Sequence, residues 1–293
     1  MRPASFIKVL LELAKFRITL AVCVTTITGY LLFKDRLNSD IILPLIGIFL
    51  LASGASALNQ VQEYRYDEKM NRTMKRPLPA GEISKPAAVT FALLLLLGGS
   101  VLLYKGSGLI VLMLGWLAFI WYNLVYTYLK RKTAFAVIPG SLVGAIPPLI
   151  GWIVAGGEPD NYLVIPIIVF FFIWQVPHFW LLILKYGKEY EAAGLATLSE
   201  TRTNRQISRL IFGWIMLTAM VTASLPFTGL LQSVISRTGT VVSALVLIIM
   251  FIPILRTRED RLEAGKFFMK INYFVLAVVL FMALDKIVFE GFL

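Results

Sequence analysis

Nine long apolar runs dominate this sequence and restrict the folds that are open to it. A hydrocarbon layer about 30 Å thick is crossed by about 20 apolar residues in helical conformation. The runs cover residues 18–33, 41–58, 86–104, 109–129, 135–155, 162–184, 210–227, 240–255 and 271–289. A hydrophobic content of 58% and a mean hydropathy of +0.79 are likewise typical of polytopic membrane proteins. The pattern predicts an all-α membrane protein with nine transmembrane helices.

The distribution of basic residues gives an independent test of these nine spans. Lysine and arginine accumulate in the cytoplasmic loops of membrane proteins. If the loops are assigned to alternate sides, 23 of the 28 basic residues fall on the side of the N-terminus and five on the other side. An error in the span count would mix the two groups. We therefore predict a cytoplasmic N-terminus and an external C-terminus. We attribute the net charge of +11 mostly to topology, together with attraction to anionic membrane lipid or an anionic substrate, and not to nucleic-acid binding.

The chain reads as one membrane domain over residues 1–293. Residues 1–16 are basic and amphipathic and run into a full-length span without a small-residue cleavage site, which predicts a retained entry helix. The single cysteine, Cys23, excludes an internal disulfide and a cysteine metal site. Polar helix ends follow both the second and the sixth spans, on the same side, so the sequence favours two pseudo-repeat halves, about 17–130 and 131–293, with the active site between them.

A polar stripe continues the second apolar run. Asn59, Glu63 and Asp67 are spaced four apart, so on a helix they form one row of oxygen atoms about 12 Å long. Magnesium is usually held by one or two carboxylates together with water and substrate phosphates. Asn59 and Glu63 lie toward the apolar span, where polar groups are costly and usually functional. The spacing predicts a magnesium site.

Basic residues follow this stripe closely, namely Arg65, Lys69, Arg72, Lys75 and Arg76. Such a cluster could neutralise a diphosphate, because the planar guanidinium group matches phosphate oxygens. A solvated loop on the positive side of the membrane is the alternative interpretation, and composition alone does not decide between them.

Further motifs recur in order along the chain. The first comprises Asn59, Glu63, Asp67, Met70, Arg72-Thr73 and Arg76-Pro77; after the fourth span come Tyr126-Thr127, Leu129-Lys130-Arg131 and Thr133; the fifth span holds Gly140, Gly144-Ala145, Pro147-Pro148 and Gly151-Trp152; the sixth ends with Trp174, Pro177-His178-Phe179-Trp180, Glu189-Tyr190 and Ala193-Gly194. Together they resemble the UbiA superfamily of membrane prenyltransferases, and within it the branch that farnesylates heme.

The resemblance implies a helical bundle with a central cavity that opens on the cytoplasmic side of the inner or plasma membrane. It implies Mg2+ as cofactor, farnesyl diphosphate and heme B as substrates, and heme A synthase or terminal oxidase assembly factors as candidate partners. The donor-site residues that it marks are Asn59, Glu63 and Asp67 for magnesium, and Arg72, Arg76, Lys130 and Arg131 as a diphosphate clamp. The residues that it marks for the acceptor, or second half of the site, are Trp174, His178, Lys185, Glu189 and Tyr190.

This sequence departs from the family pattern at several of these positions. Glu63 and Glu189 stand where the family normally has aspartate, and glutamate reaches one methylene further while it can still ligate magnesium. Relatives that prenylate quinone precursors carry an aspartate-rich second signature, whereas His178 and Lys185 stand at the corresponding places here. Basic groups at these places favour binding of diphosphate or a heme propionate over a second magnesium ion.

His178 is the only histidine, and the sequence leaves its role open. It could be a packing residue bonded to a neighbouring helix, an axial ligand of the porphyrin, a propionate partner or a general base. Two alternatives to heme farnesylation also stay open, namely prenylation of a quinone-precursor ring and a heme or ion carrier without catalysis.

Overall fold

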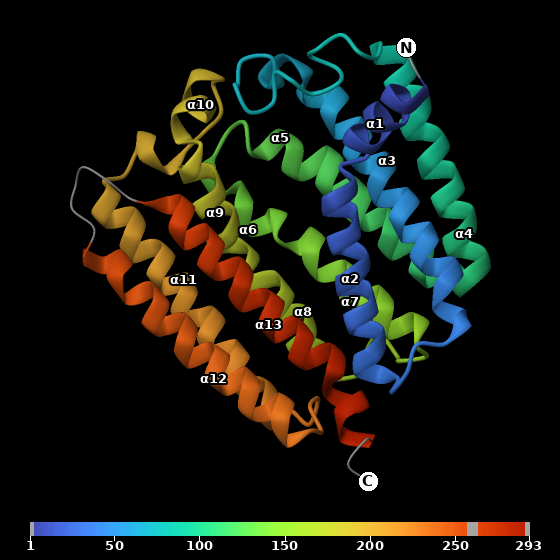
Figure 1. Cartoon of the computed structure of the whole chain (residues 1–293), viewed down its shortest axis with the longest axis vertical. Helices are drawn as coiled ribbons and strands as arrows, with labels where there is room; N and C mark the ends of the chain where they lie inside the picture. The colour runs from blue at the N-terminus through green and yellow to red at the C-terminus, as the bar shows by residue number, and fades with distance from the viewer. Residues whose placement is uncertain (1–2, 257–262, 291–293) are drawn as a thin grey trace. The chain divides into compact units, whose positions relative to one another are not determined.

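The computed structural model describes residues 3–256 and 263–290, and these contain helices, turns and loops without a β-strand. The all-α prediction is therefore confirmed for the described part of the chain (Figure 1). Three basic residues of the topology count, Arg2, Arg258 and Arg261, lie outside the described residues, as does the C-terminal end at 291–293.

The bounds of the elements are as follows. The α-helices are α1 (Pro3–Leu13), α2 (Phe16–Phe33), α3 (Ile42–Asp67), α4 (Lys85–Ile120), α5 (Thr127–Leu129), α6 (Val137–Gly140), α7 (Leu142–Val154), α8 (Val164–Ile173), α9 (Gln175–Lys185), α10 (Gly187–Ala192), α11 (Asn204–Ser224), α12 (Val234–Phe251) and α13 (Ala264–Glu290). The 3-10 segments are η1 (Ser39–Ile41), η3 (Ala134–Ala136), η4 (Leu198–Glu200), η5 (Leu225–Phe227) and η6 (Ile252–Arg256), and η2 (Trp121–Tyr126) is a π-helix.

Eight helical segments within the described ranges are long and apolar enough to cross a membrane, and each of the nine predicted runs overlaps one of them over most of its length. They cover Phe16–Phe33, Ser39–Asp67, Lys85–Leu129, Ala134–Val154, Val164–Lys185, Asn204–Phe227, Val234–Arg256 and Ala264–Asp285. The third segment has 45 residues, about twice the length that one crossing needs. It is broken at Gly108, whose φ of 77° and ψ of −166° are not helical, so it holds the runs 86–104 and 109–129 on either side of the break.

The chain forms two compact units. The first consists of the described residues of 1–24, 39–136 and 188–196, and the second of those of 25–38, 137–187 and 197–293. Every predicted donor-site residue belongs to the first unit, together with Glu189 and Tyr190. Trp174, His178 and Lys185 belong to the second unit.

Close packing of α3 against α4 organises the first unit, and the two helices run side by side in Figure 1. Glycines allow this approach. A Cβ atom added to Gly99 would lie 2.7 Å from the carbonyl oxygen of Gly47 and 2.7 Å from the backbone nitrogen of Leu51. Small residues let helix backbones approach closely inside membranes. The contact fixes the position of α3, and with it the polar residues at the C-terminal end of α3.

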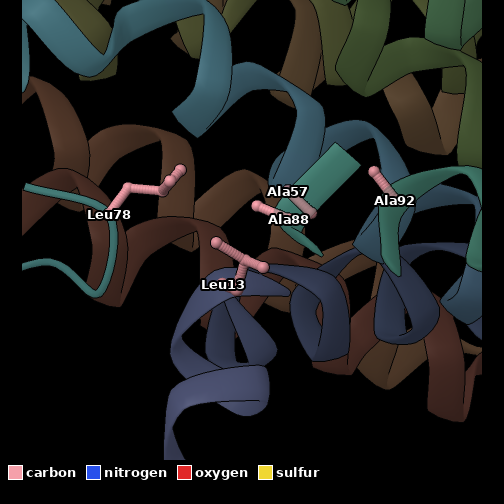
Figure 2. Close-up of a cluster of buried hydrophobic side chains, with 5 residues drawn as sticks. All are labelled: Leu13, Ala57, Leu78, Ala88 and Ala92. Carbon is pink, nitrogen blue, oxygen red and sulfur yellow. The ribbon is translucent and has the colours of Figure 1, made fainter. Parts of the chain in front are cut away.

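A cluster of buried apolar residues anchors the surrounding segments on the C-terminal half of α3. Figure 2 shows its members from α1, α3, α4 and the loop after α3, namely Leu13, Ala57, Leu78, Ala88 and Ala92. Gln60 adds a polar anchor, because its amide nitrogen donates to the carbonyl oxygens of Glu12 (3.0 Å) and Leu13 (2.9 Å). The last carbonyls of a helix have no partner inside it, and the Glu12 carbonyl also accepts from the backbone nitrogen of Lys15 (3.1 Å). The end of α1 is thereby attached to α3.

In the second unit, α11, α12 and α13 pack side by side (Figure 1). Asp285 of α13 is fully buried and accepts hydrogen bonds from the backbone nitrogens of Gln232 (2.8 Å) and Ser233 (3.0 Å), at the start of α12. A carboxylate at a helix N-terminus accepts hydrogen bonds from the free N–H groups there and interacts favourably with the helix dipole. Asp285 therefore has a structural role.

Candidate active site

Asn59, Glu63 and Asp67 lie on one helix, α3, as the spacing predicts, and all three are buried. We call them the α3 donors. They extend over the last three turns of α3, which continues nine residues beyond the end of the apolar run. Two carboxylates in an apolar bundle need compensating charges, because an unpaired buried charge is costly.

Each α3 donor is in contact with a basic side chain. Lys15 Nζ donates to Asn59 Oδ1 (2.8 Å), Lys130 forms an ion pair with Glu63, and Arg76 Nη1 donates to both carboxylate oxygens of Asp67 (2.8 and 2.7 Å). We call Lys15, Lys130 and Arg76 the basic partners. They come from three separate segments of the first unit, so their convergence on α3 is a tertiary feature.

The backbone at Lys15 is unusual. Its φ of 48° makes it the one non-glycine residue in the described ranges with a positive φ. For an L-residue this conformation costs about 1–2 kcal/mol. Thr19 Oγ1 stabilises the turn by donating to the carbonyl of Ala14 (2.9 Å). The sharp turn between α1 and α2 directs the Lys15 amine to Asn59 and to the hydroxyl of Tyr122 (3.3 Å).

The π-helix η2 fixes the amide of Asn59. Tyr122 OH donates to Asn59 Oδ1 (3.0 Å), and Asn59 Nδ2 donates to Thr127 Oγ1 (3.0 Å), which itself donates to the carbonyl of Tyr122 (2.8 Å). A single π-helical turn within an α-helix changes the register of the side chains, and such turns are frequent at functional sites. Here it brings Tyr122 and Tyr126 into a stacked arrangement, with ring centroids 6.1 Å apart.

Lys15 and Lys130 lie outside the candidate membrane spans, and their surroundings shift their pKa values in opposite directions. Burial and then the nearby Arg76 charge lower the pKa of Lys15 to about 7, against the opposing effect of Glu63. Burial also disfavours the charged form of Lys130, but the Glu63 carboxylate outweighs it and holds the pKa of Lys130 above its usual value. Lys130 is thus a permanent cation, whereas Lys15 titrates near neutrality.

Arg72 and Arg131, the other two residues of the predicted clamp, make their observed hydrogen bonds with groups other than the α3 donors. The backbone nitrogen of Arg72 donates to Glu189 Oε2 (3.0 Å), and its Nη2 donates to the hydroxyl of Tyr190 (3.4 Å). The structure thus brings the first motif into contact with Glu189 and Tyr190. Arg131 Nη2 donates to the carbonyl of Gln62 (2.9 Å), and its guanidinium group lies over two tyrosine rings. Its observed contacts are therefore structural.

A cavity of about 630 Å3 lies beside this cluster in the first unit. Its lining has four basic and two acidic side chains, and consists of Lys8, Val9, Glu12, Arg72, Lys75, Arg76 and Glu82. Arg76 belongs both to the lining and to the ion pair with Asp67. The cavity has room for a diphosphate group, and Arg76 links it to the α3 donors.

The second unit contains the other predicted residues. The His178 ring packs against Phe268 (centroids 4.9 Å apart) and Trp174 (5.0 Å). His178 Nδ1 and Trp174 Nε1 are both buried without a hydrogen-bond partner among the described residues. A buried polar atom without a partner is unfavourable, so a pair of them indicates a place that a ligand could complete. Lys185 Nζ lies 5.7 Å from the Phe268 ring centroid.

Lys15, Tyr122 and Thr127 are site residues whose roles the sequence did not reveal. Lys15 was counted only as a topological charge, and the contact with Asn59 depends on the α1–α2 turn. Thr127 belongs to the recognised motif after the fourth span, which was its only signal. Tyr122 has no motif at all, and its position depends on the π-helix.

The α3 donors fit a magnesium ion that is shared with a substrate phosphate. They offer two carboxylates and one amide oxygen, and this ion usually completes its shell with water and phosphate oxygens. Within the described residues, no group of three His, Cys, Asp or Glu side chains could hold a metal by itself. The donor set therefore fits a shared ion and does not fit a site closed by protein ligands.

The fold and the site together define a class: an α-helical membrane protein with a buried row of oxygen donors that Arg76 links to a cavity with a basic lining. The model of the UbiA prenyltransferase family matches residues 22–274. The chain belongs to the UbiA prenyltransferase family.

Curated relatives cover most of the chain. A protoheme IX farnesyltransferase of Geobacter sulfurreducens is 36% identical over 251 residues, which is 85% of this chain and 91% of the relative. One from Christiangramia forsetii is 30% identical over 98% of this chain and 96% of the relative.

Solved structures share the fold at low sequence identity. A structure described as that of a digeranylgeranylglyceryl phosphate synthase has a TM-score of 0.78 at 15% identity, over 96% of this chain and 98% of that chain. A UbiA homolog from Archaeoglobus fulgidus bound to GPP and Mg2+ has a TM-score of 0.66 at 14% identity, over 96% and 99% of the two chains.

Proposed function

We propose that this protein transfers the farnesyl group of farnesyl diphosphate to a vinyl group of heme B and so forms heme O. Relatives named protoheme IX farnesyltransferase, at 30–38% identity, support this acceptor. The observation that carries the donor half is the row of α3 donors with its basic partners beside a basic cavity.

When bound, Mg2+ would neutralise charge on the diphosphate and stabilise it as a leaving group. The residues that would supply oxygen ligands to Mg2+ are Asn59, Glu63 and Asp67. Arg76, Lys130 and the cavity-lining Arg72 would bind the diphosphate oxygens and stabilise the charge that develops as the C–O bond breaks. Arg131 was predicted for the same role, and we now assign it to packing on α3.

The farnesyl carbon that leaves the diphosphate gains allylic cation character. The stacked rings of Tyr122 and Tyr126 lie next to the α3 donors, and the negative face of an aromatic ring stabilises a cation. The apolar helices exclude water, which would otherwise capture this cation too early. The terminal vinyl carbon of the porphyrin then forms the new C–C bond, and water adds to the resulting cation beside the ring and loses a proton.

We assign Trp174, His178 and Lys185 to the acceptor. The two buried nitrogens without partners and the flat aromatic surroundings support binding of a porphyrin edge, and Lys185 supports binding of a propionate. Glu189 and Tyr190 position Arg72, with which they are in contact. We place the protein in the inner or plasma membrane with the donor site on the cytoplasmic side, where its product would be available to heme A synthase or terminal oxidase assembly factors.

The experiment that tests this function is incubation of membranes containing the protein with heme B, farnesyl diphosphate and Mg2+, followed by mass spectrometry of the extracted pigments. We expect a pigment with the mass of heme O. Unchanged heme B, with a prenylated quinone precursor in a parallel incubation, would contradict the proposal.

A further inference from the structure

All three α3 donors are already bound to basic side chains, and this arrangement has a consequence for the order in which ligands bind. Asn59 Oδ1 accepts from Lys15 Nζ (2.8 Å) and from Tyr122 OH (3.0 Å), which uses both of its lone pairs. Glu63 is paired with Lys130, and both oxygens of Asp67 accept from Arg76. A metal ion can therefore bind Asn59 Oδ1 only if Lys15 or Tyr122 leaves it, and at Glu63 and Asp67 it competes with the paired cations Lys130 and Arg76.

The charges at the site also disfavour a metal ion alone. The two carboxylates, Glu63 and Asp67, are balanced by Lys130 and Arg76, so the cluster carries no net negative charge, and Lys15 can only add positive charge. A divalent cation entering by itself would meet no net attraction. It would also leave the displaced bases buried and without a counter-ion, which is unfavourable.

A diphosphate changes this balance. It carries several negative charges and many acceptor oxygens, so each base that leaves an α3 donor can bind a phosphate oxygen instead. The metal then takes the donors, and the bases keep a counter-ion. Each ligand removes the obstacle to the other, which is the condition for thermodynamic coupling between two binding events.

We propose that the divalent metal and the diphosphate bind as one unit, with the basic partners moving from the α3 donors to the diphosphate. This proposal rests on the proposed function, and it adds Lys15 to the diphosphate-binding residues. Lys15 is suited to this exchange because the α1–α2 turn holds its amine beside Asn59. It follows α1, whose residues Lys8, Val9 and Glu12 line the cavity.

The test measures binding of Mn2+, as a spectroscopic probe for the metal, to the purified full-length protein by electron paramagnetic resonance. It is done with and without inorganic pyrophosphate. We expect Mn2+ to bind roughly 100-fold more tightly with pyrophosphate than without it. Equal affinities under the two conditions would overturn the proposal.

The variant Lys130→Met provides the sharper test, because its two binding constants should change in opposite directions. Loss of the cation next to Glu63 should tighten binding of Mn2+ alone by about tenfold or more, since a like charge has been removed. The same change should weaken binding of the Mn2+–pyrophosphate unit. The matched control, Lys132→Met, removes an exposed lysine from the same loop and should change neither constant.

If Lys130→Met weakened both constants, Lys130 would have an ordinary structural or ligand-binding role and the exchange would be refuted. Arg76→Met, with the exposed Lys132→Met again as its control, repeats the test at Asp67 if the first variant does not fold. The two proposals fail separately. Coupled binding without heme O formation contradicts the function alone, whereas heme O formation with uncoupled binding contradicts this inference alone.

Discussion

Replacement of Asp67 by asparagine removes one negative charge from the site while it keeps the shape of the side chain. Asp67 is almost fully buried, and both of its carboxylate oxygens accept from Arg76. The substitution leaves the Arg76 guanidinium group without its counter-ion and takes one oxygen donor from the metal. We expect both stability and turnover to fall.

The loss of stability follows from the burial of this pair. Breaking a fully buried pair costs about 3–5 kcal/mol, and an exposed pair contributes about 0–1 kcal/mol. The Asp67 side chain is 2% exposed and that of Arg76 is 24% exposed. We therefore expect a loss of about 2 kcal/mol, intermediate between the limits, which corresponds to a decrease in Tm of about 4–8 °C.

Turnover should fall by about 10²–10³-fold, the usual effect of removing one group that stabilises developing charge. The assay is heme O formation in detergent micelles at a temperature below the unfolding range. Tm is measured on the same samples. The control is Glu68→Gln, which makes the same charge change at the next, exposed residue. Near-normal turnover of the Asp67→Asn variant at a temperature where it is folded would refute the metal-binding role of Asp67.

Three further predictions concern packing, pH and the acceptor. Gly99→Val should lower Tm markedly because its Cβ would lie 2.7 Å from α3 backbone atoms, whereas a Cβ at the neighbouring Gly98 meets only a side-chain carbon at 3.6 Å, so Gly98→Val should have little effect. The pKa of Lys15 is about 7 in the folded protein and has its ordinary value of 10.5 in the unfolded chain. Between these values the unfolded chain binds more protons, so the free energy of unfolding should rise from pH 7 to pH 9. This rise should disappear from the Tm profile of Lys15→Met; an unchanged profile would show that Lys15 is not its source. His178→Phe should weaken heme B binding, followed by absorbance titration, while pyrophosphate binding stays at its wild-type level; a parallel loss of both would contradict an acceptor role.

The fold class was predictable because the apolar runs have the length that a bilayer requires, and each run coincides over most of its length with a helical segment of the structure. The break at Gly108 also lies between two predicted runs. The α3 donors were predictable because a spacing of four places side chains on one face of a helix whatever surrounds it. Local rules were sufficient for these features.

The partners of the α3 donors were not predictable to the same extent. Lys130 and Arg131 are adjacent and both positively charged, and only the tertiary structure shows that Lys130 pairs with Glu63 while Arg131 binds the Gln62 carbonyl. Lys15 reaches Asn59 through a left-handed turn, which sequence patterns assign to glycine rather than lysine. The π-helix that positions Tyr122 has no pattern of its own in the sequence.

In the proposed reaction, the α3 donors and their basic partners release a metal-bound diphosphate as the farnesyl group is transferred. The most direct measurement is the ratio of pyrophosphate released to heme O formed, determined on the same sample with and without Mg2+. We predict one pyrophosphate for each heme O, and loss of both products when Mg2+ is chelated. Heme O formed without pyrophosphate release, or at an unchanged rate in the presence of chelator, would contradict the account.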